Sequence, residues 1–329
     1  MIRMGERKNV VLVTGGNGLF GRKLVLRLLQ DTDVSDVVSM DLVPPKEIFL
    51  KSIEKYAGKF YFVLGDISQI EDVLTVIKSF SVQKVAHFAY QLSVIGESIP
   101  RASAKVNILG TCNVFEAARL LGVSRVLYVS SIAVYGPQTE YEDREILEDD
   151  RLHPSDIYGL TKQLNERLAG EYSNQYGMSI IGIRPSVGFG HGGRLPEIVK
   201  RFSSIVSLPA IGKRIRFDVE GSRAVSLVCV DDLAEFSKIV LDAASPIYPI
   251  YNLAAPPVSL LQVANHVRQY IPNAKIEFGH KSEVGWLPTK ISSARAKEEF
   301  GFSLRPLEEA VLIHVNDARR EAGLELIKA

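Results

Sequence analysis

Apolar residues along the chain gather in short unbroken runs, and amphipathic segments lie between them. The first run, Val10–Val13, has the uniform apolar character of a strand buried on both faces of a parallel sheet. After it, Arg22–Gln30 places leucine and valine at helical spacing, which predicts a helix packed on that sheet. Further runs of the first kind predict strands at Val37–Met40, Phe60–Leu64, Lys84–Phe88, Arg125–Val129 and Ser179–Ile183. This alternation predicts an α/β fold with a doubly wound parallel sheet.

The segments between these strands predict helices at Ile48–Lys59, Ile70–Phe80, Val106–Leu121 and Ser155–Tyr176. Beyond Arg184 the alternation loosens into shorter elements. We expect these at Leu195–Val206, in a strand pair near Ile215–Phe217 and Ser226–Val230, and at Val230–Ala244, Asn252–Leu253, Leu260–Tyr270 and Arg305–Ala322. Residues 1–184 are therefore expected to form one domain, and residues 185–329 mostly a smaller lobe, with the segment of about 225–255 returning to the first domain.

Composition narrows the class of protein. The chain has 329 residues, of which 46% are hydrophobic and 23% charged, and its formal net charge is +1, which argues against a nucleic-acid-binding protein. No apolar stretch approaches the roughly 18 residues of a transmembrane helix, and the charged N-terminus lacks the apolar core of a signal peptide. Cys112 and Cys229 lack metal-ligand spacing, so we expect two core thiols, no metal site and a reducing, cytoplasmic environment.

Three glycines, Gly15, Gly18 and Gly21, follow the first strand at three-residue spacing and open the first helix. Such a turn directs backbone N–H groups and the positive end of the helix dipole at a pyrophosphate. Glycine-rich turns are also common for purely structural reasons, so the second strand matters. It ends in Asp41, whose carboxylate can accept hydrogen bonds from an adenosine ribose, and no arginine follows to bind a 2′-phosphate. The pattern favours NAD over NADP.

Two polar residues at the next strands have alternative interpretations. Asp66 follows the strand Phe60–Leu64, where it can contact an adenine amino group or cap the helix Ile70–Phe80, and the two roles are compatible. His87 lies inside an apolar strand, which is typical of a packed core histidine rather than of a catalyst.

A serine and a tyrosine–lysine pair supply candidate chemistry. Ser131 follows the fifth strand, and Tyr158 and Lys162 are four residues apart on one face of the predicted helix. A phenol with an ordinary pKa near 10 is a poor base at neutral pH, but the lysine ammonium and the positive nicotinamide ring are expected to lower the pKa of Tyr158. Tyr158 would then take the proton of a substrate hydroxyl while Ser131 holds the oxygen. The alternative is that Tyr158 and Lys162 form a solvated helix face.

These motifs resemble those of the extended short-chain dehydrogenase/reductase family, also called the NAD-dependent epimerase/dehydratase family. The similarity covers nearly the whole chain and includes Thr14–Gly21, Gly65–Ile67, His87–Ala89, Ser130–Gly136, Tyr158–Lys162, Arg184–Pro185 and Val230–Asp232. It implies a Rossmann-type domain with a C-terminal substrate-binding lobe and a homodimer built on the helices Val106–Leu121 and Ser155–Tyr176. From the composition, we expect no membrane or nucleic-acid partner.

The resemblance also implies functional residues. The implied catalytic residues are Ser131, Tyr158 and Lys162, with Asn107 as a helix-distorting or water-positioning residue. The implied NAD contacts are Gly15, Asn17, Gly18, Leu19, Phe20, Gly21, Asp41, Asp66, Ile67, Phe88, Ala89, Tyr90, Asn107, Tyr158, Lys162 and Pro185.

Departures from the family pattern bear on the substrate. Sugar-nucleotide epimerases and dehydratases usually hold the substrate diphosphate with an Asn and an Arg where this chain has Val187 and Val225. Dehydratases also carry an Asp–Glu pair where this chain has Ile132 and Ala133, so a dehydratase is the weakest interpretation. The basic residues that could replace the missing anchors are Arg194, Lys213, Arg214, Arg216 and Lys281.

Other segments resemble a subgroup of the family, the short-chain type L-threonine 3-dehydrogenases and relatives that act on small hydroxy acids and sugar acids. The segments that carry this resemblance are His87–Pro100, Ser130–Pro137, Trp286–Pro288 and Ser293–Arg295. The resemblance implies that Ser93, with Ser131 and Tyr158, binds the substrate, whereas a helix cap is an equal alternative for Ser93.

We therefore expect an NAD-dependent dehydrogenase or ketoreductase that acts on a secondary alcohol or ketone of a small or medium polar molecule. The first alternative is a sugar-nucleotide (UDP-sugar) epimerase that keeps NAD tightly bound, and the second is a non-catalytic NAD-binding sensor. Retention of Ser131, Tyr158 and Lys162 argues against a sensor, because a binding module has no chemical need for all three.

Overall fold

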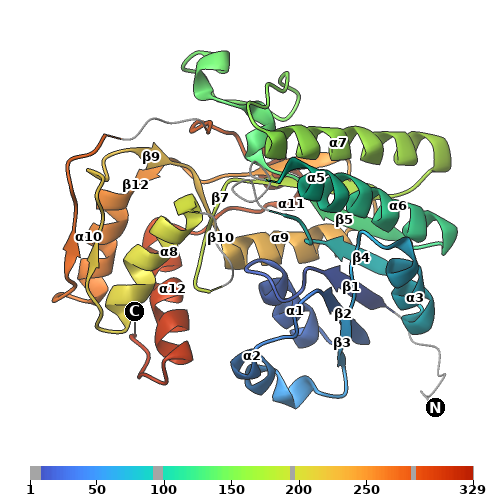
Figure 1. Ribbon diagram of the computed structural model, residues 1–329, viewed down its shortest axis with the longest axis horizontal. Helices are drawn as coiled ribbons and strands as arrows, with labels where there is room; N and C mark the ends of the chain where they lie inside the picture. The colour runs from blue at the N-terminus through green and yellow to red at the C-terminus, as the bar shows by residue number, and fades with distance from the viewer. Residues whose placement is uncertain (1–8, 92–98, 193–196, 283–286, 329) are drawn as a thin grey trace.

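A seven-stranded parallel sheet forms the centre of the computed structural model, which describes residues 9–91, 99–192, 197–282 and 287–328 (Figure 1). The strands lie in the order β11-β6-β5-β4-β1-β2-β3. Their bounds are β1 Val10–Thr14, β2 Asp36–Asp41, β3 Phe60–Leu64, β4 Lys84–His87, β5 Arg125–Val129, β6 Ile180–Pro185 and β11 Ile250–Leu253. The order reverses between β1 and β4, and ligands of such sheets bind beyond the carboxyl ends of the strands at that point. The predicted doubly wound α/β fold is confirmed.

Helices cover both faces of the sheet. Leucine and valine side chains of α1 (Gly21–Gln30) and apolar residues of α9 (Val230–Asp242) pack on one face. On the other face lie α3 (Ile70–Phe80), α6 (Thr111–Leu120) and α7 (Ile157–Tyr176). The strands between these layers are consequently shielded from solvent, and β1 is buried along its whole length.

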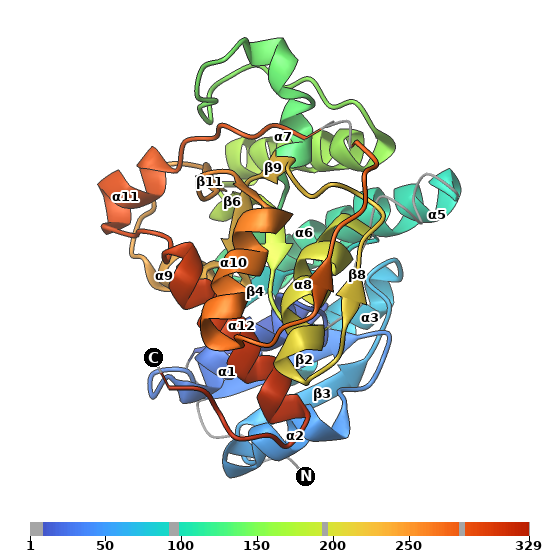
Figure 2. The ribbon, with the colours of Figure 1, turned by 90° about the vertical axis from the view of Figure 1, so that its left-hand side faces the viewer.

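A smaller lobe lies beside the sheet domain and has an apolar core of its own (Figures 1 and 2). Its helices are α8 (Glu197–Ala210), α10 (Leu260–Tyr270) and α12 (Leu307–Glu321), which pack on one another. Its short strands pair as β7 (Val187–Phe189) with β10 (Leu227–Cys229), β9 (Ala224–Val225) with β12 (Val258–Ser259) and β8 (Ile215–Arg216) with β13 (Ile276–Glu277). Among the described residues, we find no helix with the length and apolar character needed to cross a membrane.

Two predicted helices differ in detail from the structure. The expected helix Ile48–Lys59 is divided into α2 (Glu47–Ser52) and a 3₁₀ turn at Glu54–Tyr56, after which the Lys59 N–H closes a turn onto the Tyr56 carbonyl. The expected helix at residues 106–121 begins as a π-helix, Ala104–Gly110, before it continues as α6. A short helix, α5 (Pro100–Ser103), precedes it.

The predicted strand pairing in the lobe is wrong. β8 pairs with β13, some sixty residues later in the chain, and β10 pairs with β7 instead of with β8. Two-residue and three-residue strands carry too few positions to show an alternation, so their partners cannot be inferred from the pattern. Helix α11 (Ala294–Phe300) was not predicted either, because its seven residues are too few to show a clear helical period.

A buried ion pair joins α7 to the sheet beneath the carboxyl ends of β5 and β6. The Arg184 guanidinium donates two hydrogen bonds to the Glu166 carboxylate, at 2.9 and 2.7 Å, and one to the Tyr135 hydroxyl at 2.6 Å. The Ser130 hydroxyl also donates to Glu166. Arg184 is 4% exposed, so each charge depends on the other for the interactions that water would otherwise provide.

We expect Arg184→Met to lower the free energy of unfolding by about 3–5 kcal/mol, because Glu166 is then left buried without its counter-charge. The double variant Arg184→Met/Glu166→Leu is expected to recover most of this loss, since neither charge remains. Urea unfolding followed by circular dichroism measures both. Equal losses in the single and double variants would contradict this explanation.

Candidate active site

A cavity of about 1420 Å³ runs along the carboxyl ends of the strands, from the β1–α1 turn to the start of α7. The predicted cofactor residues that line it are Gly15, Asn17, Gly18, Leu19, Phe20, Gly21, Asp41, Asp66, Ile67, Phe88, Ala89, Tyr90, Tyr158 and Pro185. Ser131 lines it as well. Lys162 and Asn107 lie behind the cavity wall. Each contacts a residue that lines the cavity, Lys162 the ring of Tyr90 and Asn107 the carbonyl of Gln91. Ser93, Arg194 and Trp286 fall outside the described residues.

The glycine turn brings three stretches of backbone close together. Gly15 has a φ of +68°, and a Cβ there would lie 2.7 Å from the backbone nitrogen of Ala89. A Cβ on Gly21 would lie 2.2 Å from the carbonyl oxygen of Gly15. Helix α1 begins directly behind this turn and has no side-chain cap, so the positive end of its dipole lies beside the cavity. Such a cradle fits a pyrophosphate.

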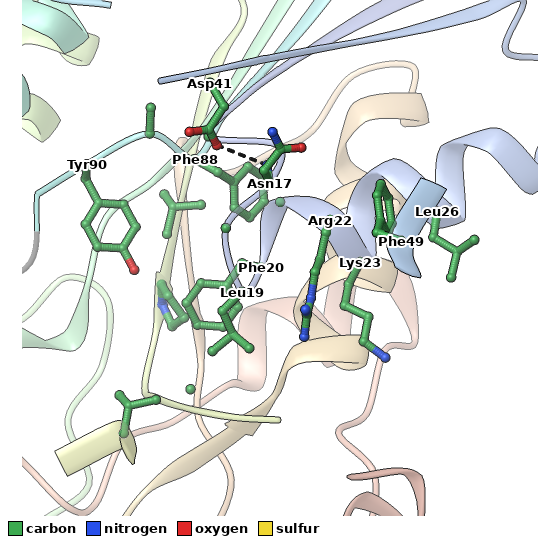
Figure 3. Close-up of a pocket in the computed structure, with 18 of the residues that line it drawn as sticks. Asn17, Leu19, Phe20, Arg22, Lys23, Leu26, Asp41, Phe49, Phe88 and Tyr90 are labelled. Carbon is green, nitrogen blue, oxygen red and sulfur yellow. Dashed lines mark hydrogen bonds between the residues drawn. The ribbon is translucent and has the colours of Figure 1, made fainter. Parts of the chain in front are cut away.

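Asp41 lies at the end of the cavity beside this turn. Its carboxylate accepts a hydrogen bond from the Asn17 N–H at 3.1 Å, the contact drawn in Figure 3, and another from the Val43 N–H at 3.3 Å. These bonds hold the carboxylate where a ribose can reach its remaining lone pairs. Asp66 accepts from the Ser68 N–H at 2.9 Å, whereas the N-cap of α3 is Gln69, so the expected cap on α3 by Asp66 is wrong.

Asn107 connects the π-helical stretch to the chain that leaves β4. Its side-chain amide donates to the Gln91 carbonyl at 2.9 Å, and its Oδ1 accepts from the Gln91 N–H at 2.7 Å. Its backbone carbonyl accepts from both Asn165 and Thr111. His87 is buried behind this cluster and hydrogen-bonds Thr14 and Thr111, as expected for a core histidine.

Tyr158, Ser131 and Lys162 meet at the catalytic end of the cavity. Ser131 lies near enough to the Tyr158 hydroxyl to act on its pKa. The Lys162 ammonium donates to the Val129 carbonyl at 2.7 Å and lies 5.6 Å from the ring centroid of Tyr158. It also lies 4.5 Å from the ring centroid of Tyr90, which comes from the segment after β4. Lys162 is 4% exposed.

Burial opposes the expected effect of Lys162 on Tyr158 in the protein without NAD. Although part of the Tyr158 side chain faces the cavity, burial of its phenol raises the pKa well above the usual range, and Tyr90 adds to this while Ser131 opposes it. Burial also lowers the pKa of Lys162 to about 7, against the opposing charge of Glu166. Both groups have left water, so the protein without a bound ligand favours the neutral phenol.

Two buried polar atoms at this end of the cavity make no hydrogen bond within the described residues. Within the described part of the chain, Gln91 Oε1 and Ser186 Oγ are buried without a hydrogen-bond partner, and both residues line the cavity. A buried polar group without a partner is costly. A ligand with neutral hydrogen-bonding groups would satisfy them, so these residues, the glycine cradle and Asp41 together fit a dinucleotide and a polar substrate.

The sequence prediction missed a charged wall on the lobe side of the cavity. Lys23 forms ion pairs with Asp231 at 3.0 Å and with Asp317 of α12 at 2.5 Å. Arg22 donates to the carbonyl of His191, and both line the cavity. Arg22 and Lys23 directly follow the last glycine of the turn, and this position could have indicated them. Nothing in the pattern of α12 places Asp317 there.

The positions at which sugar-nucleotide enzymes hold a diphosphate are apolar here. Val187 lines the cavity and is buried, and Val225 is buried in β9. Of the basic residues considered as replacements, Lys281 pairs with Asp218 at 3.0 Å and Arg214 with Glu277 at 3.3 Å. Among the described cavity residues, these two, Lys213 and Arg216 are not found.

Solved structures with this fold include an epimerase and a dehydrogenase. The UDP-glucose 4-epimerase of Thermus thermophilus, solved with NAD, has a TM-score of 0.81 at 22% identity over 94% of this chain and 99% of that one. The L-threonine dehydrogenase of Clostridium difficile has a TM-score of 0.81 at 20% identity over 97% of this chain and 100% of that one. At this level of identity the likeness shows the fold alone.

We expect Gly15→Ala to lower the affinity for NAD at least tenfold, because the added Cβ meets the backbone of Ala89. Gly122→Ala is the matched control. Gly122 has a φ of +66°, and a Cβ added there would have no heavy atom within 4 Å, so this variant suffers the same backbone strain without the clash. Isothermal titration calorimetry measures both affinities. Similar NAD affinity in the two variants would exclude the proposed cradle.

A family model and two related proteins show to which family the chain belongs. The UDP-glucose 4-epimerase of Mycolicibacterium smegmatis is 33% identical over 233 residues, which cover 68% of this chain and 70% of that protein. A protein of Methanocaldococcus jannaschii is 27% identical over 89% of this chain and 90% of its own length. The model of the NAD dependent epimerase/dehydratase family matches residues 11–254, from β1 to the strand β11. The chain therefore belongs to the NAD-dependent epimerase/dehydratase family, whose cofactor is NAD.

Proposed function

We propose that this protein is an NAD-dependent oxidoreductase that interconverts a secondary alcohol and a ketone on a small or medium polar molecule. The observation that carries the proposal is the meeting of Ser131 and Tyr158, with Lys162 behind them, at the end of the cavity that also contains the glycine cradle. In this proposal residues 1–184 bind the cofactor and carry the catalytic groups. Residues 185–329 mostly bind substrate, and residues 225–255 return to the first domain.

The proposed mechanism assigns each side chain one task. The Ser131 hydroxyl donates a hydrogen bond to the substrate oxygen and so orients the carbinol carbon. Tyr158 accepts the hydroxyl proton, or returns it in the reverse direction. Lys162 stabilises the Tyr158 phenolate by its charge and would hold a ribose of NAD, when NAD is bound. NAD, when bound, supplies the acceptor or donor of the hydride.

The lining of the catalytic end supports a substrate without a diphosphate. Val187 and Leu287 form apolar wall there, and Gln91, Ser131 and Ser186 offer neutral hydrogen-bonding groups. A diphosphate against these five residues would find no cationic side chain among them. Ile132 and Ala133 also lack the acid and base groups that a dehydratase needs.

The second candidate function is a UDP-sugar epimerase. It is favoured by the 33% identity to the UDP-glucose 4-epimerase of Mycolicibacterium smegmatis. In such an enzyme, oxidation and re-reduction at one carbon would leave no net redox change. A sensor that binds NAD without turnover is the third candidate.

The deciding experiment incubates the purified protein with NAD⁺ and a panel of L-threonine, hydroxy acids, uronic acids, sugar alcohols and UDP-sugars. We expect NADH absorbance with a free alcohol, and we expect Tyr158→Phe to lower that rate at least 10³-fold with NAD affinity nearly unchanged, because only the proton acceptor is lost. Chromatography follows interconversion of the UDP-sugars in parallel.

Each outcome separates the candidates. Interconversion of a UDP-sugar without net NADH would favour the epimerase. Binding of NAD without turnover of any compound would favour the sensor. Loss of NAD binding in a folded Tyr158→Phe protein would contradict the role given to Tyr158.

We also propose a homodimer and a cytoplasmic location. The free thiols Cys112 and Cys229 support the location, because they persist in a reducing compartment. The dimer is supported by large apolar side chains exposed along the neighbouring helices of the α6–α7 face. We define that face by Leu120, Leu160 and Leu164 together with Leu109 of the π-helix before α6, and these side chains are 53%, 52%, 42% and 48% exposed.

Light scattering at micromolar concentration is expected to give twice the mass of the chain. The double variant Leu160→Glu/Leu164→Glu is expected to be monomeric, since burying two carboxylates in an apolar interface is unfavourable. Ile247→Glu is the control, because Ile247 is 73% exposed but lies outside the α6–α7 face. A wild-type protein of single-chain mass would refute the dimer.

A further inference from the structure

A second tyrosine lies beside the catalytic pair and has no part in the mechanism above. Tyr90 follows β4, lines the cavity, and directs its phenol into it (Figure 3). Its ring centroid is 4.5 Å from the Lys162 ammonium, closer than the 5.6 Å between that ammonium and the Tyr158 ring. The centroids of the Tyr90 and Tyr158 rings are 6.0 Å apart.

The surroundings leave Lys162 few sources of stabilisation. Its ammonium donates to one carbonyl, that of Val129 on β5. Glu166, one turn further along α7, raises the pKa of Lys162 by its charge, while both of its carboxylate oxygens accept hydrogen bonds from Arg184. The negative face of an aromatic ring within about 6 Å attracts a cation, and the attraction is strongest where water is excluded. The Tyr90 ring contacts the Lys162 ammonium from the cavity side, so this ring can supply such an attraction.

We propose that Tyr90 is a positioning residue, which holds the Lys162 ammonium against its ring and keeps it charged beside Tyr158. The proposal rests on the proposed function, because it gives Tyr90 a role through Lys162. It concerns a contact between two side chains of this chain, so it can be tested without substrate.

The charge of Lys162 is sensitive to its contacts. Burial lowers the pKa of Lys162 to about 7, so a change in its surroundings alters its charge near neutral pH. An attractive ring favours the ammonium and raises this pKa, and removal of the ring lowers it. A fall of about one pH unit in this pKa would markedly reduce the charged fraction at neutral pH.

The other titratable groups around Lys162 stay neutral or paired over the relevant range. Burial lowers the pKa of His87 on β4 to about 3, with Lys162 contributing. Burial raises the pKa of Tyr90 to about 12 and that of Tyr158 well above its usual range. Glu166 remains paired with Arg184. Between pH 5 and 9, a titration of this cluster in the free protein accordingly reports on Lys162.

The test follows the ε-methylene resonance of Lys162 by NMR in protein labelled with ¹³C-lysine, from pH 5 to 9. Lys162→Arg identifies the resonance. We expect Tyr90→Phe to keep the titration midpoint within about 0.3 unit of wild type, because the ring remains, and Tyr90→Leu to lower it by about one unit. Equal midpoints in wild type and a folded Tyr90→Leu protein would overturn the proposal.

A second series keeps the shape of the ring. Phenylalanine with one, two or four ring fluorines at position 90 weakens the negative ring face stepwise with little change in size, so it remains informative even where Tyr90→Leu does not fold. The midpoint is expected to fall with each step, and a constant midpoint would refute the proposal.

Turnover gives a separate readout. With an identified substrate, kcat of Tyr90→Leu is expected to fall most above pH 7 and to recover toward pH 6, where Lys162 is charged again, while Tyr90→Phe follows wild type. Absence of NAD-linked turnover in wild type with a normal Lys162 shift would refute the proposed function alone. A normal rate with no shift would refute the role of Tyr90 alone.

Discussion

The close backbone contact between the β1–α1 turn and the chain leaving β4 is the constraint on which the rest of the structure depends. Gly15 and Gly21 let the turn pass within van der Waals distance of Ala89 and of itself. That contact sets the crevice between β1 and β4, directs the start of α1 into it, and fixes where Tyr90 and Gln91 emerge. Because the two glycines have no side chains, this one close backbone contact shapes both the cofactor cradle and the catalytic wall.

At the opposite end of the cavity, the charge states of Lys162 and Tyr158 depend on a second constraint, the exclusion of water. Lys162 and Tyr158 come from adjacent turns of α7, yet their proximity in sequence does not make the phenol acidic. Both are desolvated, and desolvation opposes the charged form of each. The balance is therefore set by groups from other elements: the Val129 carbonyl, the Tyr90 ring, and Glu166 with its partner Arg184.

The elements that the sequence predicted correctly are those with a clear hydrophobic pattern along their whole length. The strands Phe60–Leu64 and Arg125–Val129 and the helices Ile70–Phe80 and Leu260–Tyr270 were predicted with their observed bounds, because each is a complete apolar run or a full amphipathic stripe. The glycine turn and Asp41 were predicted because the chemistry of a pyrophosphate and a ribose demands those residue types in that order. Short lobe strands such as β8 and β13 lack enough positions to show a period.

Other features could not be predicted because they arise only from packing. Asp317 reaches Lys23 across nearly the whole length of the chain, and no local pattern encodes that meeting. The pKa of Tyr158 depends on how much water the folded lobe excludes. The unpartnered oxygens of Gln91 and Ser186 are likewise visible only once the surrounding elements are in place. Residue type was predictable at this site, and electrostatic environment was not.

The π-helical stretch Ala104–Gly110 has a consequence for how a change of one residue is accommodated in this chain. A π-turn contains one residue more than an α-turn, so the extra residue widens the turn and the helix that follows keeps its orientation. Deleting one residue here would restore regular α-helical geometry and leave the buried face of α6 on the sheet, yet it would displace Asn107 from its contacts with Asn165 and Gln91. The wide turn thus positions the Asn107 amide and carbonyl without altering the packing of α6.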